Sequence, residues 1–253
     1  MDFTVAIYRK LLQSFIENKY TFQTYSEFVE NPLDKVILLR HDVDDRKNNS
    51  LTFARIQNEL GIKGTYYFRM VPQSFDENVI KEIYDLGHEV GYHYEDMDFT
   101  NGDADKAILL FDEHLKKLRG IVPVSTICMH GSPKSKYDNK DVWKKYNYQD
   151  YGIIAEPYFD LNFDQTFYLT DTGRMWDGFK VSVRDKVQTS VKWPTYHSTQ
   201  QVINAIQSGD FPQQVMMNFH PQRWTDNKVQ WIKEGLIQAV KNQVKRVLIL
   251  RKK

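Results

Sequence analysis

The chain has 253 residues, of which 41% are apolar, and a formal net charge of +1 from 34 basic and 33 acidic side chains. This balance excludes the strong basic excess of a dedicated nucleic-acid binder, since the one basic cluster is the Arg-Lys-Lys of residues 251–253. One α/β domain can reach this length. We therefore expect a single domain over residues 1–253 and no nucleic-acid partner.

The N-terminal segment and the cysteine content indicate the cellular compartment in which the protein is expected. Asp2 stands where an export signal needs basic residues, and Arg9 and Lys10 interrupt the apolar residues that follow. No run approaches the roughly 18 apolar residues that a membrane span needs. Cys128 is the only cysteine, which excludes an internal disulfide and a cysteine metal cluster. We expect a cytoplasmic protein without a membrane span.

Short apolar runs alternate along the chain with segments that carry apolar residues at helical spacing. In chain order the pattern predicts helices over 4–18 and 26–29, a strand over 36–39, a helix over 51–60, a strand over 64–68, a helix over 76–86, a strand over 88–92, a helix over 103–119, a strand over 124–129, a helix over 141–148, strands near 153 and 167–169, a helix over 198–208, a strand over 215–219, a helix over 227–242 and a final apolar run over 247–250. Such alternation predicts a parallel sheet, open or closed into a barrel.

Polar side chains follow four of the predicted strands. They are the HDVDD of residues 41–45, the HYED of residues 93–96, the HGSP of residues 130–133 and the HPQRW of residues 220–224. The C-terminal ends of parallel strands meet at one edge of the sheet, where α/β proteins bind and transform their ligands. The four segments are therefore expected to form one site.

The first of these segments places two carboxylates together. Side chains alternate along an extended chain, so Asp42 and Asp44 project to one side while His41 and Asp45 project to the other. A carboxylate pair repels itself unless a proton or a metal cation lies beside it. The alternative is a solvated acidic loop after a strand.

These residues resemble the polysaccharide deacetylase family, also called NodB-like or carbohydrate esterase family 4. The matching pieces are residues 36–44, 64–68, 87–93 and 218–221, and the GHEVGYH of residues 87–93 is the most specific of them. The resemblance implies an α/β fold, a distorted (β/α) barrel with about seven parallel strands. It also implies a metal-dependent hydrolase that removes an N-acetyl group from a carbohydrate.

The resemblance assigns roles to four residues. Asp42 would be the general base and His220 the general acid, while Asp44 and His93 would bind the metal. The implied cofactor is a divalent transition metal, with zinc expected. Hydrolysis of an acetamide fits this set, because it needs an activated water and a proton for the leaving amine.

The third metal ligand departs from the family pattern. The family's second metal histidine lies four residues after the first, where this chain has Met97, an unlikely ligand for such an ion. Strand alternation puts His88 on the face opposite His93 and excludes it. Glu95, Asp96 and His130 remain, and we favour His130, which ends a neighbouring strand.

The family's third motif, built around Arg and Pro, is also not matched, because the MHGSP of residues 129–133 stands in its place.

Five residues are candidates for substrate binding. Trp176 and Trp224 could offer flat faces to sugar rings. Arg174 could bind a carboxylate or phosphate on the substrate, or could be a surface residue of a tight turn. Glu95 and Arg223 belong to the polar segments described above.

The expected substrate is a precursor of a surface polysaccharide, such as a nucleotide-linked or lipid-linked sugar, because no export signal is seen. Two alternatives stay open. One is a catalytically inactive barrel that binds a sugar or a protein partner. The other is a metal-independent amide or ureide hydrolase of the same superfamily.

Overall fold

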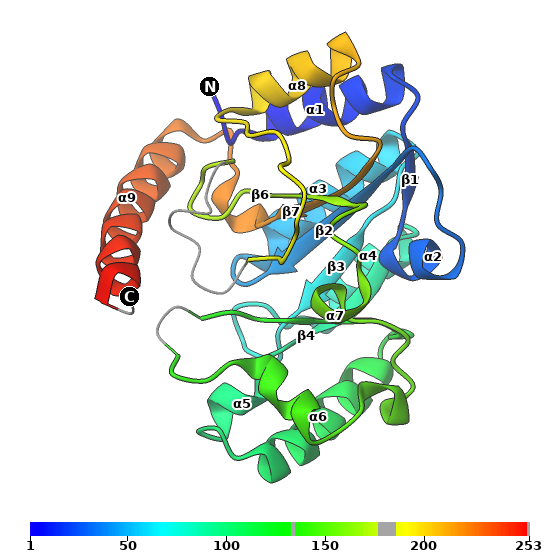
Figure 1. Ribbon diagram of the computed structural model, residues 1–253, viewed down its shortest axis with the longest axis vertical. Coiled ribbons are helices and arrows are strands. Elements are labelled where there is room, and N and C mark those ends of the chain that lie inside the picture. The colour runs from blue at the N-terminus through cyan, green and yellow to red at the C-terminus, as the bar shows by residue number, and fades with distance from the viewer. Residues whose placement is uncertain (133–134, 177–185, 252–253) are drawn as a thin grey trace.

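The computed structural model describes residues 1–132, 135–176 and 186–251. Its described residues form a seven-stranded, all-parallel sheet that curls into a half-barrel (Figure 1). The strands are β1 (Thr21–Gln23), β2 (Val36–Val43), β3 (Thr65–Phe68), β4 (Glu89–Tyr94), β5 (Ile127–Met129), β6 (Phe167–Thr170) and β7 (Gln214–Phe219). Their order is β5-β4-β3-β2-β7-β6, with β1 paired to β2. The expected distorted (β/α) barrel is thereby confirmed.

Helices alternate with these strands along the chain. They are α1 (Val5–Glu17), α2 (Tyr25–Glu30), α3 (Lys47–Glu59), α4 (Glu77–Asp85), α5 (Asp96–Phe99), α6 (Ala104–Arg119), α7 (Pro157–Asp160), α8 (Thr199–Ser208) and α9 (Lys228–Arg251), with short 3₁₀ helices η1 (Asn139–Lys144), η2 (Tyr148–Tyr151) and η4 (Pro221–Arg223). Side-chain caps fix several starts: the Thr4 hydroxyl accepts from the Ile7 amide, and Asp76 and Asp103 cap α4 and α6.

The structure corrects several predicted elements. The helix predicted over 141–148 is replaced by η1 and η2, and the strand near 153 is reduced to one parallel bridge between Thr126 and Ala155. The apolar run over 247–250 continues α9. Strand β2 extends to Val43, four residues beyond the predicted end, because Arg40 and Asp42 neutralise each other within it.

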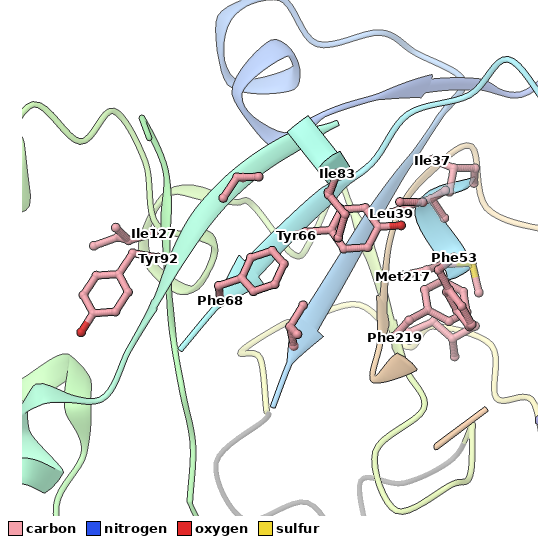
Figure 2. Packing of buried hydrophobic residues seen from close by; sticks show 14 of the residues in the cluster. Ile37, Leu39, Phe53, Tyr66, Phe68, Ile83, Tyr92, Ile127, Met217 and Phe219 are labelled. Carbon is pink, nitrogen blue, oxygen red and sulfur yellow. The ribbon is translucent and has the colours of Figure 1, made fainter. Parts of the chain in front are cut away.

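The two faces of the sheet have different partners. Ile37, Leu39 and Val43 of β2 pack with apolar side chains of the helices, and Figure 2 shows Phe53 of α3 beside Met217 and Phe219 of β7 in this layer. The opposite face of β2 carries Val36, Leu38, Arg40 and Asp42, which alternate with the first set. This second face is the inner face of the half-barrel.

Gly91 of β4 lets the inner face pack closely. A Cβ atom at this position would overlap the ring of Tyr67 and would lie 2.9 Å from the Thr126 carbonyl oxygen. The Tyr67 hydroxyl makes a 3.1 Å hydrogen bond with the Thr126 hydroxyl. Gly91, the second glycine of the GHEVGYH segment, is therefore required for Tyr67 to lie next to β4, and the strand can then continue to His93.

His88 lies on the helix-facing side of β4, as strand alternation predicts. Its Nδ1 accepts from the Gly64 amide at 3.2 Å, and its Nε2 donates to the Ala54 carbonyl at 2.9 Å. Protonation of Nδ1 would place two N–H donors, those of His88 and Gly64, opposite each other and would break this hydrogen bond. Burial accordingly lowers the pKa of His88 from 6.5 to about 4, although the hydrogen bond to Ala54 opposes the shift.

Replacing His88 by Gln should reduce the loss in the free energy of unfolding as the pH falls from about 6.5 to about 4. Between pH 6.5 and about 4 the unfolded chain binds a proton at His88 that the folded chain does not. The free energy of unfolding therefore falls as the pH falls, by about 1.4 kcal/mol per pH unit for this group. Glutamine can keep one donor and one acceptor without titrating. Urea unfolding of wild type, His88→Gln and the exposed control His197→Gln from pH 4 to 7 checks this; parallel wild-type and His88→Gln profiles would contradict it.

Candidate metal and catalytic site

Five polar side chains meet at the C-terminal edge of the sheet. They are Asp42, Asp44, His93, His130 and His220, which end or follow β2, β4, β5 and β7. His93 Nε2 lies 3.8 Å from Asp42 Oδ2 and 3.5 Å from Asp44 Oδ1. His220 Nε2 lies 4.0 Å and 3.8 Å from the Oδ2 atoms of the same two carboxylates. The structure thus brings together every residue predicted to act as acid, base or metal ligand.

Asp42 is held rigidly by neighbours on the inner face. Arg40 donates from Nε to Oδ1 at 2.8 Å and from Nη2 to Oδ2 at 2.7 Å, and Asn218 donates to Oδ2 at 3.0 Å. Burial raises the pKa of Asp42, but the charges of Arg40, His93 and His220 outweigh it and bring the value down to about 2. Both oxygens are therefore engaged and the group is ionised at neutral pH.

Asp44 is held less tightly. Its Oδ2 accepts from Gln222 at 3.2 Å, while its Oδ1 is buried and has no hydrogen-bond partner among the described residues. That oxygen lies 3.5 Å from His93 Nε2 and 3.6 Å from His130 Nε2. Burial raises the pKa of Asp44, but its histidine neighbours hold it well below the usual value. A buried, ionised oxygen without a donor is an open ligand position.

Two imidazoles direct Nε2 toward Asp44. His93 Nδ1 lies 2.8 Å from the Cys128 carbonyl oxygen, to which it can only donate, so Nε2 keeps its lone pair. His130 Nδ1 lies 2.8 Å from Glu95 Oε2, and Glu95 also accepts from Arg69 at 2.8 and 2.7 Å. Outer groups that fix the tautomer in this way are typical of histidines that bind metals.

The donor set of Asp44, His93 and His130 fits a transition metal such as zinc. It offers one carboxylate oxygen and two imidazole nitrogens, which zinc accepts, and three protein ligands leave a position open for substrate or water. The unpartnered Oδ1 of Asp44 is the observation that favours this set.

Two different groups of side chains have ligand atoms that all lie within 4.8 Å of one another, a distance that the structure does not give for His93 and His130. They are Asp42, His93 and Cys128, and Glu95, Asp98 and His130. In the first group both oxygens of Asp42 are already used by Arg40, and in the second both oxygens of Glu95 are used by Arg69. We therefore favour the set with Asp44.

His220 is supported by Asp171, a residue that the sequence analysis missed. Asp171 Oδ1 lies 2.5 Å from His220 Nδ1, and its Oδ2 accepts from the His220 amide at 2.9 Å. Arg223 Nη1 also donates to Oδ1, at 3.1 Å, and Trp224 Nε1 donates to Oδ2 at 2.6 Å. Burial raises the pKa of Asp171, but His220 and Arg223 lower it overall. The signal in the sequence was a carboxylate directly after the strand near 167–169.

Three predicted substrate residues make contacts within the protein. Trp224 is 1% exposed and Trp176 is 3% exposed, and the indole of Trp176 donates to the Thr199 hydroxyl at 2.8 Å. Arg174 donates to the Trp231 carbonyl at 2.7 Å and lies over the Trp231 ring at 4.4 Å. Trp176 also lines a hollow of about 440 Å³ together with Tyr168 and Trp193. A substrate role for Trp176, Trp224 and Arg174 stays a prediction. Glu95 and Arg223 lie at the site but support His130 and Asp171.

A polar hollow of about 470 Å³ adjoins the site on the side of His130. Its walls include Arg69, Glu95, Asp98, Asn101, His130 and Ser132. Polar walls of this kind offer several hydrogen-bonding groups to a ligand rich in hydroxyls.

Comparisons with known proteins give similar folds at low identity. A pseudoenzyme of carbohydrate esterase family 4 from Bacillus anthracis is 14% identical with a TM-score of 0.47, over 84% of this chain and 63% of that chain. A family 4 carbohydrate esterase from Bacillus anthracis is 13% identical with a TM-score of 0.40, over 96% and 89%. One from Bacillus subtilis is 13% identical with a TM-score of 0.43, over 92% and 84%. All three scores are below 0.5, so no functional conclusion rests on them.

No family model matches the chain, and no curated protein does. Among the described residues, no helix has both the length and the apolar character to cross a membrane.

Removing Arg40 should destabilise the protein through Asp42. The Arg40→Met variant leaves a buried carboxylate without its cation, which typically costs about 3–5 kcal/mol. Adding Asp42→Asn removes that charge, so the double variant should be more stable than the sum of the single changes by at least about 2 kcal/mol. Chemical unfolding of the four proteins measures this coupling energy.

The exposed pair Arg55–Glu82 is the matched control for that cycle. Exposed ion pairs are worth roughly 0.2–1 kcal/mol, so its coupling energy should be smaller. Equal coupling energies in the two cycles would contradict the role given to Arg40.

Proposed function

We propose that this protein is a metal-dependent hydrolase that removes an N-acetyl group from a carbohydrate. The observation that carries the proposal is the carboxylate pair of Asp42 and Asp44, faced by the Nε2 atoms of three histidines. Keeping five ionisable groups in one cluster, three of them buried and two partly buried, costs stability unless the cluster has a function. The resemblance of residues 36–44, 87–93 and 218–221 to polysaccharide deacetylases supports the same reaction.

Asp44, His93 and His130 would hold the metal, for which zinc is the expected ion. A zinc ion bound there would supply a Lewis acid for the acetamide carbonyl and would make water more acidic. The protein's own part is to direct the two Nε2 atoms toward Asp44, which the contacts of Nδ1 with Cys128 and Glu95 support, and to keep Asp44 ionised.

Asp42 is proposed as the general base that accepts a proton from the attacking water. Its oxygens lie on the same side of β2 as Asp44, and the Arg40 pair keeps it ionised. The same pair lowers the pKa to about 2, which makes the carboxylate a weak base. We therefore expect a contribution near the lower end of the usual 10²–10⁴-fold range for general base catalysis.

His220 is proposed as the acid that protonates the leaving amine. Its Nδ1 is directed at Asp171, so Nε2 is the nitrogen that faces the carboxylate pair and can carry the transferred proton. Asp171 fixes the ring orientation and stabilises the imidazolium that carries this proton. Asp42 would thus accept the proton of the attacking water, and His220 would donate a proton to the leaving amine of the same amide.

An N-acetylated sugar is the proposed substrate, because the polar hollow beside His130 suits a hydroxyl-rich ligand. A panel of N-acetylated sugars, including nucleotide-linked ones, tests it by release of acetate. An inactive barrel that only binds sugars would bind members of the panel without releasing acetate.

Protein purified without chelators should contain about one transition metal per chain. We expect elemental analysis to find it in wild type and in the exposed control His197→Ala, and to find it lost in His93→Ala. Zinc added to the metal-free wild type should also raise its melting temperature, a readout independent of activity. The same metal content in wild type and His93→Ala, or none even after zinc is added, would contradict the metal site.

Asp42→Asn should lower the kcat of the folded variant by about 10²-fold or more, because the amide cannot accept the water proton. The change also leaves Arg40 without its counter-ion, so circular dichroism is used to verify that the variant is folded. The matched control is Asp45→Asn, which removes the same charge from an exposed neighbour whose side chain accepts a hydrogen bond from the Arg46 amide. Acetate release from the best sugar of the panel measures both. Equal activity in the two variants would remove Asp42 from the base role.

A further inference from the structure

Three contacts in series connect helix α9 to Asp44. Glu234 of α9 lies with its Oε2 atom 3.2 Å from Arg46 Nη2. Arg46 donates from Nη1 to the Gln222 carbonyl at 3.2 Å, and Gln222 donates from Nε2 to Asp44 Oδ2 at 3.2 Å. Glu234, Arg46 and Gln222 are defined here as the positioning series. The series joins the last helix of the fold to a proposed metal ligand.

The hydrogen bond from Gln222 determines which oxygen of Asp44 faces the two histidines of the metal site. Because Gln222 holds Oδ2, the other oxygen, Oδ1, is the one that lies 3.5 Å from His93 Nε2 and 3.6 Å from His130 Nε2. The side chain of Asp44 is 22% exposed against 6% for Asp42, so packing restrains it less. A donor fixed at one oxygen opposes rotation of the carboxylate, and groups behind a metal ligand usually orient it in this way.

Arg46 has a backbone conformation that its neighbours must maintain. Its φ angle is 50°, in the left-handed region that residues other than Gly, Asn and Asp seldom adopt. Arg46 stands at the N-cap position of α3, yet its side chain makes no capping hydrogen bond. The guanidinium instead reaches Gln222 and Glu234. Such a conformation persists where surrounding contacts hold it, and Glu234 supplies a charged contact.

The docking of α9 holds Glu234 in a fixed place. Glu234 is 8% exposed. Elsewhere on the helix, Asn242 donates to the Gly173 carbonyl at 2.9 Å. The Trp231 indole donates to the Asp2 carbonyl at 2.7 Å. These hydrogen bonds do not involve Glu234, so α9 keeps them when Glu234 is changed.

We propose that Glu234 is a positioning residue for the metal ligand Asp44. Glu234 holds Arg46, and Arg46 fixes the main chain of Gln222. The Gln222 amide then keeps Oδ1 of Asp44 directed toward the two histidines. This role rests on the proposed function, because Asp44 is taken as a metal ligand. The series acts on the zinc affinity by preorganising one ligand, without any of its own side chains binding the metal.

The affinity of the metal-free protein for zinc measures this role without reference to activity. Gln222→Met keeps the length of the side chain but removes the donor, so it should weaken zinc binding about 10-fold or more. Glu234→Gln acts two contacts further away and should weaken it at least about threefold. Glu82→Gln is the matched control, because it removes an acidic partner from Arg55 on the exposed surface, and it should bind zinc as wild type does. Competition with a chromophoric chelator measures the four dissociation constants.

Arg46→Asn distinguishes the series of contacts from a direct effect of charge. Asparagine tolerates a positive φ and is too short to reach Glu234, so the loop keeps its backbone while the series is broken. In the Arg46→Asn background, Glu234→Gln should change the zinc affinity by less than about 1.5-fold. If the carboxylate of Glu234 attracted zinc through space, the loss on Glu234→Gln would persist in this background and would overturn the proposal. Only the effect of Glu234→Gln is compared, because Arg46→Asn itself removes a positive charge.

Cobalt in place of zinc reports the geometry of the ligands. Its visible absorption depends on their arrangement, so Glu234→Gln and Gln222→Met should change the spectrum of the cobalt-loaded protein while Glu82→Gln should not. A zinc affinity or a cobalt spectrum equal to that of wild type in Glu234→Gln would overturn the role of Glu234 and leave the metal site in place. Wild type that binds neither ion would overturn the metal site itself, and the positioning role with it. Circular dichroism verifies that each variant is folded.

Discussion

The buried ion pair between Arg40 and Asp42 determines how the site is arranged. Both residues lie on the inner face of β2, and Arg40 is 2% exposed, so its charge has almost no water around it. The geometry of the pair is good and two further groups add hydrogen bonds, Asn218 to Asp42 and the Tyr158 hydroxyl at 3.3 Å from Arg40 Nη2. Arg40 Nη1 is buried and has no hydrogen-bond partner among the described residues. The pair keeps β2 extended to Val43. That extension positions Asp44, the first residue beyond the strand.

The hydrogen-bond acceptor at Nδ1 orients each of the three histidines of the site. Each presents Nε2 to the carboxylates because Nδ1 meets an acceptor, which is a carbonyl for His93, Glu95 for His130 and Asp171 for His220. The acceptors differ in charge. The acceptor behind His93 is a neutral carbonyl, while those behind His130 and His220 are the carboxylates of Glu95 and Asp171. Burial lowers the pKa of His130, but the contact with Glu95 outweighs it and raises the pKa overall.

Sequence patterns predicted the order of strands and helices because each strand is short, buried and followed by polar residues. They also predicted that His88 and His93 lie on opposite faces, which depends only on strand alternation. The burial of Trp176 and Trp224 against the N-terminal segment could not be predicted from such local patterns. Phe3 packs against both indoles, with ring centroids 6.1 and 5.0 Å away, and a contact with the N-terminus leaves no local signal. The short elements β1, α5 and α7 were missed for the same reason, since distant neighbours stabilise them.

The Arg40–Asp42 pair lies within one strand, and this has a consequence for how such a site can vary. The carboxylate and its cation are two residues apart, and one continuous segment of eight residues, β2 (Val36–Val43), carries both. The pair therefore depends on the sequence of this single strand. The loop after β5 therefore does not need to supply a cation for Asp42. A change in its length or sequence would leave the counter-ion of Asp42 in place, and in this chain the loop supplies His130 and part of the wall of the hollow beside it.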